Sequence, residues 1–285
     1  MQSRSLPLLG LIIGSLIAFA ANSVLARAAI DGEGMDALAF AGIRLTSGAI
    51  VLLPVLTKRP SAGAWREADL VGAVSLALYA AGFSLAYVAL GTGTGALVLF
   101  AAVQMALLTF GFIEERRLRL LDAIGVVLAL CGLTVLIGGV DLSAGSAWAI
   151  AAMTGAGLAW GVYTVRGRLS RNPIVSTASN FVWATVLFGL PALTWVVLSG
   201  QLADITLNGF LFAVISGALA SGLGYTIWYR TVPHLDHATA GAVQLATPAV
   251  AAIGAALFLS EPIGWTLAAG GVVILSGIGL TLRQR

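Results

Sequence analysis

The stretch DALAFAGIRLTSGAIVLLPVL, residues 36–56, is an almost continuous apolar run that contains one permanent cation, Arg44. About twenty apolar residues form a helix long enough to cross a hydrocarbon core of roughly 30 Å. A charge near the centre of such a helix costs at least about 2.5 kcal/mol on insertion scales, so it is expected to be paired or functional. The stretch therefore predicts a transmembrane helix and makes Arg44 a candidate functional residue.

Similar apolar runs fill the whole chain. Of its 285 residues, 59% are hydrophobic and 9% are charged, whereas soluble domains carry roughly 25% charged residues. The runs do not alternate in polarity as the strands of a membrane β-barrel would. We therefore predict an all-α integral membrane protein with ten transmembrane helices and no soluble domain. The expected spans are residues 6–28, 35–57, 69–90, 93–113, 119–138, 147–166, 174–198, 206–230, 236–259 and 263–282.

The loops on the two sides of these spans differ in charge. One side gathers most of the cations, which are Arg4, Lys58, Arg59, Arg66, Arg116, Arg117, Arg119, Arg166, Arg168, Arg171, Arg230, Arg283 and Arg285. The other side holds one cation, Arg27, together with the acids Asp31, Glu33, Asp141, Asp204 and Glu261. The positive-inside rule places the basic loops and both termini in the cytoplasm. We expect a multi-pass protein of the bacterial inner membrane.

The chain contains an internal repeat. The segment that starts at Thr94 can be laid without gaps on the segment that starts at Thr239, and the segment from Gly14 overlays the one from Gly155. These matches predict two five-helix repeats, residues 1–142 and 143–285. Because each repeat has an odd number of helices, the two copies have opposite orientations, as in many secondary transporters.

The stretch QLATPAVAAIGAALFLSEPIGW, residues 244–265, resembles the ninth-to-tenth helix signature of the drug/metabolite transporter superfamily, EamA type. Pro248 and Glu261 with the proline after it match that pattern, Ser260 stands where glycine is usual, and an arginine in the second helix, here Arg44, is frequent in the family. The resemblance implies two inverted repeats around a central cavity, alternating access, and gating or structural roles for Arg44, Pro248 and Glu261.

Three shorter segments narrow the resemblance. LYAAGF (residues 78–83), VLFAAVQ (98–104) and LAWGVYT (158–164) look most like bacterial amino-acid exporters of the YddG type. This likeness implies export of aromatic or other neutral amino acids. A broad-specificity metabolite or drug carrier, or a membrane assembly protein that transports nothing, are the alternatives.

Aromatic and amide side chains occur in the middle of several spans. Spacings of three or four residues place neighbouring members on one helix face, and aromatic rings with a polar handle suit the wall of a binding cavity. The alternative is that they face lipid or the membrane interface, which fits tryptophans at span edges such as Trp148 and Trp195. The candidate substrate-binding residues are Tyr79, Phe83, Phe100, Gln104, Trp160, Tyr163, Trp228 and Gln244.

The middle of every span lacks Asp, Glu and His. A proton relay across a membrane usually needs such groups, so the sequence favours a neutral or zwitterionic small molecule. His234 and His237 lie in a short turn without further ligands, and a metal site needs more of them. Protease and lipase motifs are absent from the sequence as well. We expect no cofactor, no metal, no enzymatic activity and no nucleic-acid partner; a monomer is compatible with the sequence.

Two roles for Arg44 remain open from the sequence. It lies about nine residues into its span, or roughly 13 Å at 1.5 Å per residue, and its counterpart in the second repeat is Asn180. In the structural alternative, Arg44 bonds helix-end carbonyls or an acid such as Glu261. In the substrate-binding alternative, the N–H donors of the Arg44 guanidinium attract a substrate carboxylate.

The predicted orientation can be tested with epitope tags. Tags at both termini and within residues 60–64 should be accessible from the cytoplasm, because the basic loops stay on that side. Tags near residues 32 and 142 should be accessible only from outside. Labelling of intact and permeabilised cells measures this, and a terminus found outside would contradict the topology.

Overall fold

The computed structural model describes residues 5–58, 69–115, 124, 127–128, 131–132 and 144–282. All regular structure in these residues is helical, which confirms the all-α prediction. Among them, seven helical segments are long and apolar enough to cross a membrane, and α3 (Leu70–Ala86) is a shorter apolar helix. The expected span 119–138 lies almost entirely outside the described residues, so the count of ten stays a prediction.

The elements follow the expected spans closely. In chain order they are α1 (Ser5–Arg27), η2 (Ala28–Gly32), α2 (Ala37–Lys58), α3 (Leu70–Ala86), α4 (Thr92–Glu115), α6 (Ala144–Arg168), α7 (Pro173–Ala184), η3 (Thr185–Gly189), α8 (Leu190–Leu198), η4 (Gln201–Asp204), α9 (Leu207–Ile215), η5 (Ser216–Leu223), α10 (Gly224–Thr231), η6 (Val232–His234), α11 (His237–Gln244), α12 (Ala246–Phe258) and α13 (Trp265–Leu282).

Four of the described spans are not uniform helices, and in the first of them α1 continues into the π-helical η2. The π-helical segments η3 and η5 join α7 to α8 and α9 to α10, so each pair forms one rod across the predicted membrane. The span formed by α11 and α12 is interrupted at Leu245. Pro248 lies in the first turn of α12, where a missing N–H is tolerated, and its ring disfavours a continuous helix past the carbonyl of Gln244. Pro248 therefore favours the interruption between α11 and α12.

Polar side chains begin several helices. Asn172 accepts a hydrogen bond from the Val175 N–H, and Pro173 stands at the first position of α7. Thr206 and Asp236 cap α9 and α11 in the same way. Such caps satisfy N–H groups that have no partner within the helix. The short polar breaks in the sequence thus become defined helix starts.

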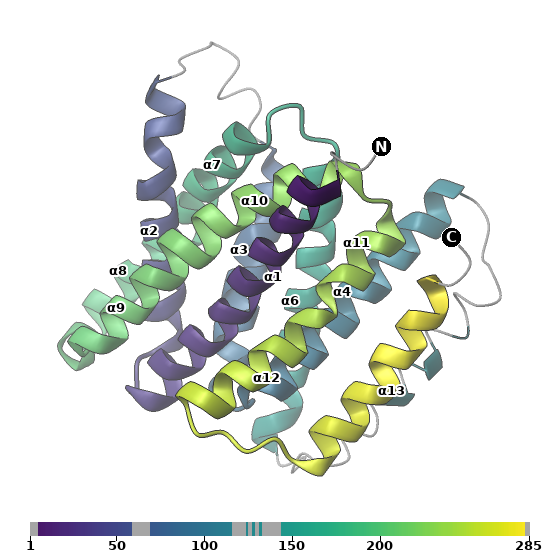
Figure 1. Ribbon diagram of the computed structural model, residues 1–285. Helices are drawn as coiled ribbons and strands as arrows, with labels where there is room; N and C mark the ends of the chain where they lie inside the picture. Colours follow the sequence, from purple (N-terminus) through teal and green to yellow (C-terminus); the bar gives the residue numbers. More distant parts are fainter. Residues whose placement is uncertain are drawn as a thin grey trace.

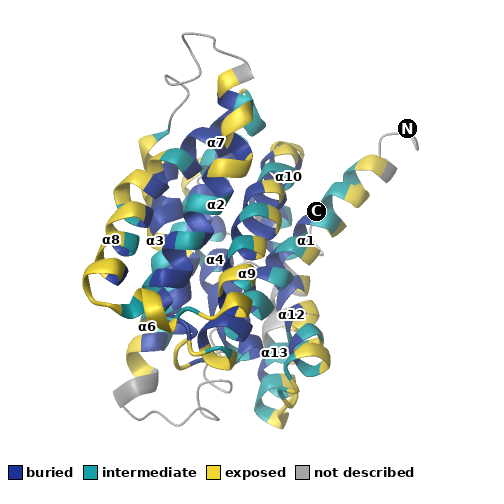
Figure 2. Ribbon diagram, turned by 90° about the vertical axis from the view of Figure 1, so that its left-hand side faces the viewer, coloured by how far each residue is buried: buried dark blue, intermediate teal, exposed yellow. Residues whose placement is uncertain are grey.

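The helices form one bundle. Figure 1 shows α1 between α10 and the α11–α12 rod, with α13 at the edge of the bundle, and α1 packs against both α10 and α12. Buried residues lie on the inner faces, while exposed ones follow the outer side of α8 (Figure 2). Leu198, Phe258 and Trp265 are 79%, 78% and 82% exposed. Large exposed apolar side chains of this kind are expected on a surface that faces lipid.

The backbone of α2 lies directly against η5. A Cβ added at Gly217 would be 2.0 Å from Ser47 Oγ and 2.1 Å from the Arg44 carbonyl oxygen. Small residues allow helix backbones in membranes to approach in this way. The contact brings Arg44 of α2 beside Ser221 of η5. The opposite orientation of the two repeats, residues 1–142 and 143–285, remains a prediction.

Candidate functional site

Arg44 lies at the centre of the candidate site. Its side chain is 1% exposed. Nε donates to Ser221 Oγ at 2.9 Å, and Nη2 donates to the hydroxyls of Tyr79, at 3.0 Å, and Tyr225. The Tyr225 hydroxyl in turn donates to Tyr79 at 3.1 Å. Three uncharged hydroxyls from α3, η5 and α10 therefore orient the guanidinium.

Two aromatic rings cover the same guanidinium. Arg44 Cζ lies 5.0 Å from the ring centre of Tyr79 and 4.7 Å from that of Phe83. Cations are attracted to ring faces at such distances. The remaining nitrogen, Nη1, is buried and has no hydrogen-bond partner among the described residues. The guanidinium is thus oriented and enclosed, but one of its donors is unused.

The partners that the structural alternative names for Arg44 are not the ones observed. Within the described part of the chain, neither helix-end carbonyls nor Glu261 bond to its guanidinium, whose partners are side-chain hydroxyls. Glu261 instead bonds to Arg27 and Thr92. The reason is position: Arg44 lies in the middle of the bundle, whereas Glu261 follows the end of α12.

The predicted aromatic residues lie together around this arginine. Trp160 is central, with ring-centre distances of 4.9 Å to Tyr79, 5.2 Å to Tyr163 and 4.6 Å to Tyr225. We call the buried aromatic group the aromatic box. Its members are Phe19, Tyr79, Phe83, Phe100, Trp160, Tyr163, Phe181, Tyr225 and Trp228.

Sequence reasoning missed Phe19, although its ring touches four members of the box. Ring-centre distances are 6.3 Å to Phe100, 5.3 Å to Trp160 and 5.5 Å to Trp228. The residue has no polar group that would single it out. The overlay of Gly14 on Gly155 does place Phe19 opposite Trp160, so the repeat held the signal.

The two candidate glutamines behave differently. Gln244 Oε1 accepts from Trp160 Nε1 at 2.7 Å, while Gln244 Nε2 donates to the Ala240 carbonyl. Gln244 therefore holds the indole of Trp160. Both polar side-chain atoms of Gln104 are buried without a hydrogen-bond partner among the described residues. A buried amide in that state has unused capacity to bind a ligand.

Asn22 supports the site from α1. Its Oδ1 accepts from Ser216 Oγ at 2.7 Å and Ser221 Oγ at 3.1 Å, and its Nδ2 donates to the Tyr225 hydroxyl at 3.2 Å. Asn22 thus fixes two of the three groups that orient Arg44. Trp228 is held separately, because its Nε1 donates to Thr164 Oγ1 at 3.3 Å.

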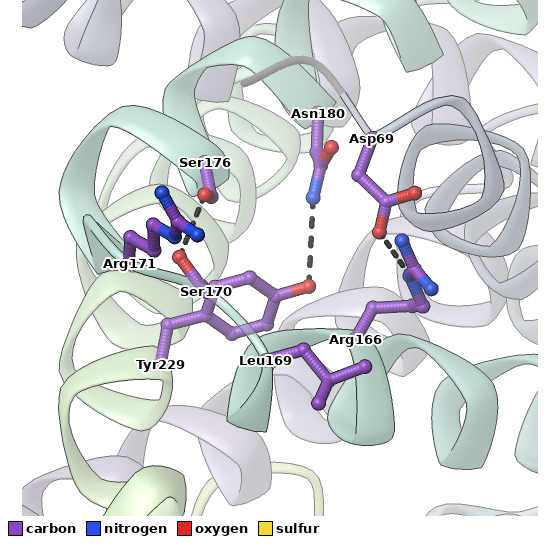
Figure 3. A pocket seen from close by; sticks show the side chains of 8 residues that line it. All are labelled: Asp69, Arg166, Leu169, Ser170, Arg171, Ser176, Asn180 and Tyr229. Atoms are coloured by element: carbon purple, nitrogen blue, oxygen red, sulfur yellow. Dashed lines mark hydrogen bonds and ion pairs between the residues drawn. The ribbon is translucent and has the colours of Figure 1, made fainter.

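A polar pocket of about 210 Å³ lies at one end of the bundle (Figure 3). Arg166 and Asp69 form an ion pair across it, and Asn180 Nδ2 donates to the Tyr229 hydroxyl at 3.4 Å. We call this pocket the vestibule. It is lined by Asp69, Arg166, Leu169, Ser170, Arg171, Ser176, Asn180 and Tyr229.

Tyr229 separates the vestibule from the aromatic box. Its hydroxyl donates to the Tyr163 carbonyl at 3.0 Å, and the two rings lie 4.6 Å apart. Tyr225 is one helical turn away on α10 and bonds to Arg44. The vestibule is therefore about one turn, or roughly 5.4 Å, from the shell of Arg44.

The opposite end of the bundle holds a hydrogen-bonded network that we call the latch, formed by Arg27, Thr92 and Glu261. Arg27 Nε donates to Glu261 Oε1 at 3.1 Å, and the Thr92 N–H donates to Glu261 Oε2 at 2.9 Å. The carboxylate thus also caps the first turn of α4, where a negative charge is favourable. Ser260, just before Glu261, has φ 55°. This backbone conformation favours glycine, which is the usual residue at this position in the family that the sequence resembles.

Comparisons with known proteins agree on the class of protein. A profile of the EamA-like transporter family matches residues 147–283. An uncharacterized protein of Pseudomonas aeruginosa is 41% identical, covering 96% of this chain and 94% of its own. An uncharacterized transporter of Clostridium kluyveri is 25% identical over 93% of this chain and 90% of its own length. An uncharacterized transporter of Archaeoglobus fulgidus is 25% identical over 78% of this chain and 80% of its own length.

A protein of known crystal structure has the same fold, with a TM-score of 0.68 at 18% identity, covering 94% of this chain and 96% of that chain. The apolar helices, the family profile and the relatives named transporters together indicate a multi-pass membrane transporter for small molecules. The chain belongs to the EamA-like transporter family. This membership points to a transporter without enzymatic activity, in agreement with the sequence analysis.

The latch should be measurable in a double-mutant cycle. The side chains of Arg27 and Glu261 are 18% and 24% exposed, whereas Asp31, which pairs with the same arginine, is 56% exposed. We expect a coupling of about 1–2 kcal/mol between Arg27 and Glu261, and below about 0.5 kcal/mol between Arg27 and Asp31, because solvent screens the exposed pair.

Thermal unfolding in detergent of Arg27→Ala, Glu261→Ala, Asp31→Ala and the two double mutants gives both couplings. Strictly additive losses for Arg27 and Glu261 would contradict the latch.

Proposed function

We propose that this transporter exports aromatic or other neutral amino acids by alternating access across the bacterial inner membrane. The aromatic box around Arg44 is the observation that carries the proposal. An amino acid has an apolar side chain and two charged groups, and the box offers ring surfaces, a cation and uncharged hydrogen-bonding groups. Sites for small molecules typically combine an apolar lining with a few such polar groups.

The proposed substrate wall consists of the residues that the sequence analysis singled out. Tyr79, Phe83 and Trp160 would contact the substrate next to Arg44, and Phe100, Tyr163 and Trp228 would enclose it. Gln104 would contribute an amide with free hydrogen-bonding capacity. Gln244 would act through Trp160, which it holds by a hydrogen bond.

The two ends of the bundle supply the proposed gates. The basic residues Arg166 and Arg171 line the vestibule, which we therefore assign to the cytoplasmic side. The latch then closes the external side. A substrate entering the vestibule would have to displace Tyr229 from Tyr163 to reach the box. Release to the outside would require Glu261 to part from Arg27, and the break before Pro248 could serve as a hinge.

A broad-specificity metabolite or drug carrier is the alternative. The ring surfaces of the box would accept many apolar molecules. A cationic drug would need a carboxylate partner, and none of the described residues places one at Arg44. The arrangement therefore favours a neutral or zwitterionic solute over a cationic one.

The proposal predicts a loss of transport when the wall is truncated. Purified protein in liposomes should take up labelled phenylalanine or tryptophan, and Tyr79→Ala, Phe100→Ala and Trp160→Ala should each lower the rate about tenfold, as expected for the loss of about 1.4 kcal/mol of binding. Trp195→Ala is the matched control, since Trp195 is 60% exposed on α8. Unchanged uptake in all three wall variants would refute the assignment.

A further inference from the structure

No acidic side chain among the described residues pairs with the positive charge of Arg44. A guanidinium stays protonated and has five N–H donors. In Arg44, Nε and Nη2 bond to hydroxyls, while Nη1 is buried without a partner. A buried charge is normally paired, because its removal from water is costly. Hydroxyl dipoles and ring faces reduce this cost without cancelling the charge.

The acids of the described residues lie at or beside helix ends, and most of them are engaged there. Asp69 pairs with Arg166, and Glu261 pairs with Arg27. Glu114 meets His237 at 2.5 Å, and Glu33 accepts from Thr206 at 2.7 Å. Asp36 accepts from backbone N–H groups at the start of α2. None of these described carboxylates bonds to Arg44, which leaves a bound ligand as the source of the negative charge.

A purely structural arginine would explain only part of this geometry. The bonds of Nε and Nη2 already connect α2 to α3, η5 and α10. They leave the third nitrogen of the fork without a role. Asn22 adds to the argument, because it holds Ser221 and Tyr225 in the positions that orient the guanidinium. An oriented donor with no partner is the pattern of a site prepared for a ligand.

The single positive charge of Arg44 restricts the charge of the ligand that it can bind. The other described cations lie at helix ends, as Arg27, Arg166 and Arg168 do, so the site offers a single positive charge. A carboxylate has one negative charge and two oxygens in a plane that matches a guanidinium. A phosphate would bring a charge of about −1.5 to −2 and would call for a second cation.

We propose that Arg44 binds the carboxylate of the transported solute through Nη1, so that a carboxylate is required of every good substrate. Tyr79 and Phe83 fix the plane of the guanidinium, and Asn22 acts as a positioning residue through Ser221 and Tyr225. This inference rests on the proposed function, because it concerns the same site and names the part of the substrate that the site selects.

Uptake of four compounds with the same phenyl ring distinguishes the carboxylate requirement from the proposed transport of amino acids. They are phenylalanine, phenylalaninamide, phenethylamine and 3-phenylpropionate, and their uptake by the wild-type protein in liposomes is compared. The inference predicts that phenylalanine and 3-phenylpropionate are carried at least tenfold faster than the two compounds without a carboxylate. Equal uptake of phenylalanine and phenylalaninamide overturns the inference and leaves amino-acid transport standing. Transport of 3-phenylpropionate without phenylalanine overturns the proposed function alone, and transport of none of the four overturns both.

Variants of Arg44 supply the second measurement. Arg44→Gln should lower phenylalanine uptake at least tenfold while uptake of phenethylamine stays the same or rises, and Arg44→Lys should retain an intermediate rate. Arg230→Gln is the matched control, because Arg230 lies exposed at the end of α10. Proportional loss of all four compounds in Arg44→Gln would show a structural role and overturn the inference. If this variant does not fold, the wild-type comparison decides alone.

Discussion

The burial of one unpaired guanidinium is the constraint on which the centre of this transporter depends. Arg44 is almost fully enclosed and is oriented by hydroxyls rather than by an acid. A charge in this environment is tolerated only if the surrounding groups are fixed. The close contact of α2 with Gly217, the hydrogen bonds of Asn22 and the stacked rings provide that rigidity. The site is consequently well ordered before any solute arrives.

The two ends of the bundle are held by different polar networks. The latch joins α1, α4 and the turn after α12 through a carboxylate that accepts several hydrogen bonds. At the vestibule, Tyr229 donates to the carbonyl of Tyr163 and accepts from Asn180, and Arg166 pairs with Asp69.

The helices could be predicted from the sequence because a hydrocarbon core fixes the length of an apolar run. The break at Leu245 is consistent with Pro248, and the buried aromatics were found from their position in mid-span. The partners of Arg44 could not be found in this way, since Tyr79, Ser221 and Tyr225 lie far from it along the chain. The vestibule was also missed, because it is built from helix ends and short polar turns that carry no periodic pattern.

The central claim is that the substrate supplies the negative charge that Arg44 lacks. The most direct measurement is an experimental structure of the transporter with phenylalanine bound. The account predicts the phenyl ring against Trp160 and Tyr79, with a carboxylate oxygen at about 2.7–2.9 Å from Arg44 Nη1, as in charge-assisted hydrogen bonds. A phenylalanine whose carboxylate lies away from Arg44, while Nη1 still lacks an acidic partner, would contradict the account.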